Sequence, residues 1–187
     1  MVRTRVGYAG GEEENPTYYN LGGHSETIQI DYDPSKITYE QLLDVFWDSH
    51  TPSVPSYSLQ YRNAVFYHNE EQRELAIESK KRYAEKINAE IYTEIIPFTG
   101  FYLAEDYHQK YYLQHEADIY RELRQIYPDM EDFINSTAAA RLNGYAGVYG
   151  TEEELKNGLD DLGLSDAAEE RLLKIALRRL RPGCSVN

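Results

Sequence analysis

The sequence of 187 residues contains a single cysteine, Cys184, which stands three residues from its end. One cysteine excludes an intramolecular disulfide and a cysteine-rich zinc site. Long apolar runs are missing too, since no window approaches the roughly 18 apolar residues of a membrane-spanning helix. No charged stretch followed by an apolar run opens the chain, so no secretory signal is visible. Together these absences predict a soluble, cytoplasmic protein.

Positive charge is also scarce. The chain has 19 Lys and Arg against 32 Asp and Glu, which gives a formal net charge of -13. This excess of negative charge would repel a nucleic acid and argues against nucleic-acid binding. Hydrophobic residues make up 41% of the chain, with 18 tyrosines, and this is enough for a core. The length fits one domain, or one domain with an appendage.

The hydrophobic pattern predicts an α+β chain. Residues 26–32 alternate cleanly between apolar and polar side chains, as a half-buried strand does. Pro34 ends this strand, since proline cannot donate to a ladder. Shorter strand patterns cover residues 3–8, 64–67 and 91–95.

Helix starts are predicted by capping boxes, in which a polar N-cap is followed three residues later by Glu or Gln. Thr38 with Gln41 opens one helix, and Asn69 with Gln72 opens a charged, solvated helix that extends to about residue 88. Residues 106–125 are predicted to form one helix rich in tyrosine. In the first of these helices we expect Leu42, Leu43, Val45 and Phe46 to face inward.

The sequence changes character near Asp129. A glycine-broken segment follows, and then two short helices with Thr151 and Ser165 as their N-terminal caps. We therefore predict an α+β core over residues 1–128 and a helical C-terminal extension over residues 129–187.

Five separated stretches form a set of motifs. They are Gly7–Gly11, Asn15–Tyr18 (Asn-Pro-Thr-Tyr), Gly23–Glu26 (Gly-His-Ser-Glu), Gln60–Arg62 and Tyr102–Gln109 (Tyr-Leu-Ala-Glu-Asp-Tyr-His-Gln). In this order they resemble the peptide methionine sulfoxide reductase A family, and the resemblance covers about residues 3–115. Any one stretch is weak evidence, and their coincidence carries the resemblance.

The resemblance implies reduction of methionine-S-sulfoxide, free or in proteins, to methionine. This chemistry needs a thiolate that attacks sulfur, an acid that protonates the departing oxygen, and hydrogen-bond donors that hold that oxygen. By resemblance Glu26 is the acid, kept protonated by burial against apolar walls, and Tyr18 and Tyr61 are the phenolic donors. The resemblance implies no bound cofactor and no metal, with thioredoxin or another thiol as the reductant.

Each candidate residue also has a plain structural interpretation. A glutamate at the start of a strand is ordinarily a surface carboxylate, and a tyrosine beside a loop usually packs with its hydroxyl in water. The pair Gly10 and Gly11 is typical of a turn that needs positive φ. Two isolated histidines, His24 and His108, are weak evidence for a metal site.

The sequence departs from the family in what it lacks. The Gly-Cys-Phe-Trp motif with the nucleophilic cysteine is absent, and the loop after His50 has no acidic residue up to Ser58. The family core resembles a two-layer ferredoxin-like (split βαβ) fold, and this chain would begin at its second strand. An open sheet edge and an uncovered apolar face would remain. Losing a few hundred square ångströms of apolar burial costs several kcal/mol, so marginal stability is expected.

Three interpretations of the missing nucleophile remain open. In the first, Met1 is an internal methionine, and a cysteine or selenocysteine lies upstream. In the second, the protein is a pseudo-enzyme or interaction module that binds methionine sulfoxide or a partner protein without reducing it. In the third, Cys184 is the working thiol. With an upstream nucleophile, Cys184 would suit a recycling role, in which it resolves a sulfenic acid through a disulfide.

Overall fold

The computed structural model describes residues 2–179, and their contacts form two units. The first unit contains residues 6–105, and the second contains residues 2–5 and the chain from Asp106 onward. The division therefore falls between Glu105 and Asp106. The boundary after residue 128 concerned the family core and remains a prediction.

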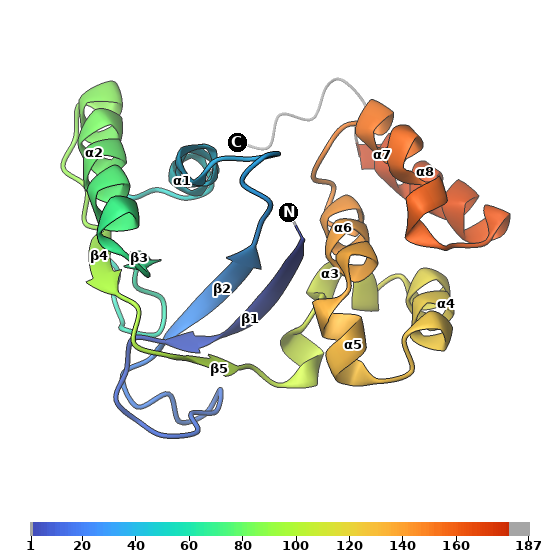
Figure 1. Ribbon diagram of the computed structural model, residues 1–187, viewed down its shortest axis with the longest axis horizontal. Helices are drawn as coiled ribbons and strands as arrows, with labels where there is room; N and C mark the ends of the chain where they lie inside the picture. The colour runs from blue at the N-terminus through green and yellow to red at the C-terminus, as the bar shows by residue number, and fades with distance from the viewer. Residues whose placement is uncertain (1, 180–187) are drawn as a thin grey trace. The chain divides into compact units, whose positions relative to one another are not determined.

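A three-stranded sheet forms one part of the first unit, apart from its residues 3–5, which are counted with the second. It contains β1 (Arg3–Ala9), β2 (Ser25–Asp31) and β5 (Phe101–Leu103) in the order β2-β1-β5 (Figure 1). β1 and β5 are antiparallel, with Gly7 opposite Leu103 and Ala9 opposite Phe101. Because β1 lies in the middle, β2 has a neighbouring strand on one side only.

A second, two-stranded sheet is built by a βαβ unit. β3 (Ala64–Tyr67) leads into α2 (Glu70–Ile87), and β4 (Glu94–Pro97) returns parallel to β3 (Figure 1). Asn69 caps α2 by accepting a hydrogen bond from the Gln72 backbone N–H, as predicted. The Gln72 side chain bonds the His68 backbone N–H instead of that of Asn69, so the capping box is only half formed.

The helix α1 (Tyr39–Asp48) begins at the predicted capping box of Thr38 and Gln41. It packs on α2 through Trp47, whose indole N–H donates to the Ser79 hydroxyl at 3.1 Å. Val45 was expected to face inward, but its side chain is 64% exposed. Only a narrow stripe of the helix is buried, and its two buried residues, Leu43 and Trp47, lie four positions apart on the same face. The buried cluster of this unit is Leu43, Trp47, Val65, Ala76 and Ile91.

The second unit is helical. Its helices are α3 (Tyr111–Gln114), α4 (Ala117–Ile126), α5 (Met130–Asn135), α6 (Thr137–Ala146), α7 (Glu152–Gly158) and α8 (Asp166–Arg179), with short 3₁₀ turns η1 (Asp106–His108) and η2 (Asp160–Leu162). The caps predicted at Thr151 and Ser165 both accept backbone N–H groups three residues on. None of the helices within residues 2–179 is long and apolar enough to cross a membrane.

The prediction of one helix over residues 106–125 is wrong. The segment is divided into η1, α3 and α4. Lys110 breaks it first, because its backbone adopts a left-handed φ of 52°. Its buried ammonium group donates to the backbone carbonyl and the hydroxyl of Thr4. A tertiary contact therefore fixes a conformation that local helix propensity disfavours.

Candidate functional site

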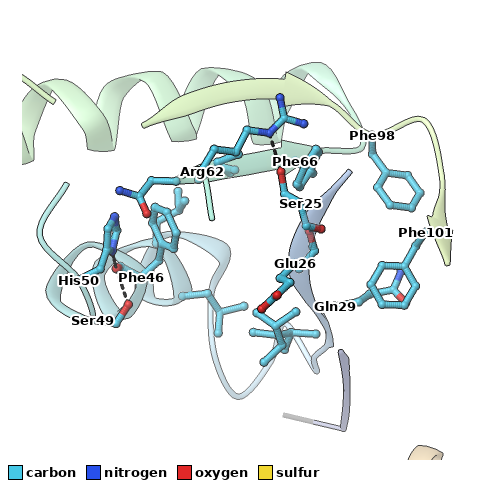
Figure 2. Close-up of a pocket in the computed structure, with 18 of the residues that line it drawn as sticks. Ser25, Glu26, Gln29, Phe46, Ser49, His50, Arg62, Phe66, Phe98 and Phe101 are labelled. Carbon is cyan, nitrogen blue, oxygen red and sulfur yellow. Dashed lines mark hydrogen bonds between the residues drawn. The ribbon is translucent and has the colours of Figure 1, made fainter. Parts of the chain in front are cut away.

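A cavity of about 550 Å³ opens between β2, α1 and β3 in the first unit. Figure 2 shows Glu26 between Phe46 and His50 on one side and Phe98 and Phe101 on the other. Consecutive residues 25–30 of β2 line the cavity, so it runs along the edge of that strand.

Glu26 lies at the start of β2 and on the wall of this cavity. Its backbone N–H donates to the Gln60 carbonyl at 3.0 Å, and its carboxylate accepts from the Gln60 side-chain amide at 2.7 Å. The side chain is exposed, whereas the resemblance implied burial against apolar walls. The cavity is open at this point, so water reaches the carboxylate.

Tyr61 and Tyr18 lie next to each other. The side-chain amide of Gln60 also donates to the Tyr61 hydroxyl, at 3.1 Å. A hydrogen bond with Tyr18 is the main reason why the pKa of Tyr61 is raised, and partial desolvation adds to it. Tyr61 and Gln60 line the cavity. Tyr18 is outside the lining and is connected to the cavity through its hydrogen bond with Tyr61.

The structure therefore brings the three predicted site residues together from three distant segments. Gln60 connects Glu26 with Tyr61, and Tyr61 connects with Tyr18. Sequence reasoning included Gln60 in a motif but gave it no role. The signal that could have found it was its position directly before Tyr61, where an amide can donate to two acceptors. The catalytic roles of the three residues remain predictions.

His24 supports the loop that carries Tyr18. It is buried, its Nδ1 accepts from the Gly11 backbone N–H at 3.2 Å, and its Nε2 lies 3.0 Å from the Glu13 carbonyl. Both ring nitrogens are thus used within the loop, with Nε2 as the donor. A Cβ on Gly11 would stand 2.4 Å from the His24 backbone nitrogen, so only glycine fits there.

Arg62 connects the segments around the cavity. Its Nε donates to the Ser25 hydroxyl at 2.6 Å (Figure 2), and its Nη2 donates to the Gly10 carbonyl at 3.0 Å. Its Nη1 lies 3.8 Å from the Glu94 carboxylate. One planar guanidinium thereby fixes the end of β1, the start of β2 and the start of β4.

The other candidate residues lie elsewhere. His108 belongs to η1 in the helical unit, and Cys184 lies outside the described residues. Within residues 2–179, no group of three or more His, Cys, Asp or Glu side chains is arranged to hold a metal ion.

Comparison with known proteins agrees with the motifs. A family model described as peptide methionine sulfoxide reductase matches residues 1–142. A peptide methionine sulfoxide reductase of Drosophila melanogaster is 40% identical over 167 residues, which is 88% of this chain and 67% of that protein. A peptide methionine sulfoxide reductase MsrA of Methanothermobacter thermautotrophicus is 46% identical over 122 residues, covering 59% of this chain and 72% of that protein.

Solved structures give the same result. Methionine sulfoxide reductase A of Corynebacterium diphtheriae aligns with a TM-score of 0.57 and 30% identity, over 60% of this chain and 63% of that chain. Reduced Mxr1 from Saccharomyces cerevisiae aligns with a TM-score of 0.57 and 29% identity, over 61% of this chain and 71% of that chain. This chain thus spans about two thirds of the length of several relatives. With a family match over most of its length, the chain belongs to the peptide methionine sulfoxide reductase A family.

Proposed function

We propose that this protein serves in the reduction of methionine-S-sulfoxide, free or in proteins, to methionine, as a repair reaction under oxidative stress. The observation that carries the proposal is the hydrogen-bonded array of Glu26, Gln60, Tyr61 and Tyr18. Glu26 and Tyr61 line one cavity, and Tyr18 is hydrogen-bonded to Tyr61. This acid and these two phenols offer the proton and the donors that a departing sulfoxide oxygen needs. The names of the relatives support the same activity.

In the proposed reaction a thiolate attacks the sulfoxide sulfur, and Glu26 in its protonated form gives a proton to the oxygen. Tyr18 and Tyr61 donate hydrogen bonds to that oxygen as negative charge develops on it. The attack joins the two sulfur atoms, and the protonated oxygen becomes a hydroxyl on the substrate sulfur. This hydroxyl then passes to the attacking sulfur, the bond between the two sulfurs breaks with its electron pair on methionine, and the attacking thiol becomes a sulfenic acid. A second thiol resolves the sulfenic acid to a disulfide and water, and thioredoxin or another thiol reduces the disulfide.

The attacking thiol must come from outside residues 2–179, because the only cysteine of the sequence is Cys184. We propose a cysteine or selenocysteine on an additional segment as nucleophile and Cys184 as the recycling thiol. This chain, which lacks the nucleophile, is then expected to be inactive by itself. A cytoplasmic setting would keep these thiols reduced.

The cavity offers a place for such a segment. β2 and β3 each end their sheet, and both line the cavity, so the backbone of an added strand could pair there. Two buried atoms in the lining, the Tyr39 hydroxyl and His50 Nε2, have no hydrogen-bond partner. Buried polar atoms are normally satisfied. We propose that the first strand of a ferredoxin-like core belongs in this cavity, and that it carries the nucleophile to Glu26.

A second candidate is binding of methionine sulfoxide, or of a partner protein, without reduction. The exposure of Glu26 favours it, because the resemblance implied an acid buried against apolar walls and this side chain lies open to water. Both candidates require a sulfoxide to bind at the array, and they differ in whether turnover follows.

Titration of isotope-labelled protein with N-acetyl-methionine-S-sulfoxide methylamide, followed by NMR, tests the shared requirement. We expect chemical-shift changes at Glu26, Gln60 and Tyr61, and weaker changes with the R epimer and with the methionine compound. Tyr61→Phe should weaken binding about tenfold, since a hydrogen bond to the sulfoxide oxygen is lost. Tyr19→Phe is the matched control, because that ring is 91% exposed. An unperturbed spectrum at millimolar ligand would refute sulfoxide binding.

A synthetic strand containing Gly-Cys-Phe-Trp separates the two candidates. Added to the protein with dithiothreitol, it should slow amide exchange in β2 and β3 and give methionine from the sulfoxide, whereas the Gly-Ser-Phe-Trp peptide should give slow exchange without turnover. Slow exchange with neither peptide giving methionine would favour the binding module. Cys184→Ser should then block turnover with thioredoxin but not with dithiothreitol if Cys184 recycles the enzyme.

A further inference from the structure

Glu105 follows β5 and makes two hydrogen bonds that connect the sheet with the loop of Tyr18. One carboxylate oxygen accepts from the Tyr8 hydroxyl at 2.6 Å, and the other accepts from the Tyr18 backbone N–H at 3.1 Å. Tyr8 is 2% exposed and lies in β1, the central strand of its sheet. The carboxylate thus has a rigid anchor on one side and a loop residue on the other.

The loop needs such a support. Tyr18 lies in a four-residue turn closed by two backbone hydrogen bonds, each 3.0 Å long, between Thr17 and Asn20. The neighbouring Tyr19 is 91% exposed, so little packing holds the tip of the turn. A hydrogen bond to an acceptor that is itself anchored on β1 fixes the direction of the Tyr18 N–H.

We propose that Glu105 is a positioning residue, which holds Tyr18 so that its phenol stays beside Tyr61 at the sulfoxide site. This inference rests on the proposed function and adds to it a residue that touches neither the substrate nor the acid. Ala104, directly before it, donates its N–H to the Val6 carbonyl at 3.1 Å, so the backbone carrying Glu105 is itself part of the sheet. The position of Tyr18 is therefore set from β1 and β5 through one carboxylate.

Three substitutions test the two hydrogen bonds of Glu105 separately. Glu105→Ala removes both hydrogen bonds. Glu105→Gln keeps an acceptor for the Tyr18 N–H, and its amide can donate to the Tyr8 hydroxyl, which can turn to accept. Tyr8→Phe removes only the anchor. Glu12→Ala, an exposed glutamate in the segment before the turn, is the matched control.

The test measures amide exchange of Tyr18, the NMR titration of the Tyr61 phenol, and the dissociation constant for N-acetyl-methionine-S-sulfoxide methylamide. Glu105→Ala should speed exchange of the Tyr18 amide at least tenfold, shift the Tyr61 titration and weaken binding about tenfold. Glu105→Gln should restore all three to within about threefold. Tyr8→Phe should give intermediate values, and Glu12→Ala should match the wild type.

The inference is overturned if Glu105→Gln, with Trp47 fluorescence and helical circular dichroism of the wild type, loses as much as Glu105→Ala, since the charge alone would then matter. It is also overturned if Glu105→Ala leaves Tyr18 exchange and the Tyr61 titration unchanged. Neither the Tyr18 amide exchange nor the Tyr61 titration requires a ligand. A wild-type protein that binds no sulfoxide would refute the proposed function while the role of Glu105 in holding Tyr18 is still measured.

Discussion

The helical unit and the sheet unit differ most in how they bury apolar side chains. Among the described residues, the helical unit has a cluster of thirteen buried residues, drawn from α3 to α8. The sheet unit has a cluster of five, confined to α1, α2 and their surroundings. The strand β2, which carries Glu26, has exposed or half-buried side chains after Ser25, and Ile28 is 57% exposed.

The larger buried core and the candidate site therefore lie in different units of this chain. The helical unit buries its apolar side chains in a core of its own. The sheet unit instead holds the candidate site beside an open cavity, where β2 and β3 each have an unpaired edge among the described residues. Exposed strand edges and exposed apolar side chains favour association with another strand. We therefore expect residues 6–105 to be the less stable region, and the following substitutions test this expectation.

The largest effect is expected from Phe133→Ala in the helical unit. Phe133 is fully buried, packs edge-on against Tyr120 and lies under the Arg124 guanidinium. Its loss should lower the free energy of unfolding by about 3–5 kcal/mol. In the sheet unit Leu43→Ala should cost only about 2 kcal/mol, because Leu43 already borders the open cavity. Amide exchange in α6 reports the first loss and Trp47 fluorescence in urea the second. Equal losses would contradict the comparison.

The helical unit should also depend on pH through Lys110. Burial, assisted by the nearby Arg5, lowers the pKa of Lys110 from 10.5 to about 8. Between about pH 8 and pH 10.5 the folded state then holds fewer protons than the unfolded state, so stability rises with pH in that window. Lys110→Met should abolish this rise and remove a charging penalty of about 3 kcal/mol at most at pH 7, partly offset by lost bonds to Thr4.

Urea unfolding at several pH values, followed by amide exchange in α4, measures the Lys110 effect. Lys86→Met is the control, since Lys86 is an exposed surface cation near Asp48. If the rise between pH 8 and pH 10.5 persists in Lys110→Met, another group causes it.

Helix caps should contribute about equally in both units. Ser136 caps α6 by accepting from the Ala139 N–H at 3.0 Å, and Thr38 caps α1 by accepting from the Gln41 N–H at 3.2 Å. Replacing either by alanine should cost about 1 kcal/mol, and Ser136→Thr should cost less. Thermal unfolding measures both. A much larger loss at Thr38 would show that α1 is held mainly by its cap.

The smallest effect concerns Tyr61 in the sheet unit. The hydrogen bond with Tyr18 is the main cause of its raised pKa, so Tyr18→Phe should bring that pKa down toward 10.0. The raised value favours the protonated phenol in the folded state, so its contribution to stability is present below the ordinary pKa and is lost as pH rises through the folded one. An NMR titration of the Tyr61 ring carbon measures the shift. Tyr19→Phe should leave it unchanged.

Local chemistry explains why many elements could be predicted. The capping residues Thr38, Asn69 and Thr151 each bond a backbone N–H three residues along the chain, so none of these three caps needs tertiary structure to form. The strand over residues 64–67 was predicted at its observed bounds. The strand predicted over residues 91–95 is observed as Glu94–Pro97, because its pairing with β3 begins at Ala64 opposite Glu94. Ile91 and Thr93 are buried but lie before this ladder.

Other features were decided by contacts between distant residues. The sequence predicted one helix over residues 106–125, and Lys110 divides it because its ammonium group bonds Thr4 across the unit. Glu26 was expected in an apolar environment, and it is exposed because the cavity beside it is open. Neither Gln60 nor Glu105 carried a signal in the sequence strong enough to assign its two hydrogen-bond partners.

By itself the sequence determined the family and the order of most elements, and it supplied Glu26, Tyr18 and Tyr61 as candidates, because motifs and caps consist of neighbouring residues. The tertiary structure alone decided that Gln60 joins Glu26 to Tyr61, that Glu105 holds Tyr18, and that two sheets end at one cavity. The physical reason is that a hydrogen bond between residues far apart in the chain depends on distance and direction, which residue spacing does not encode.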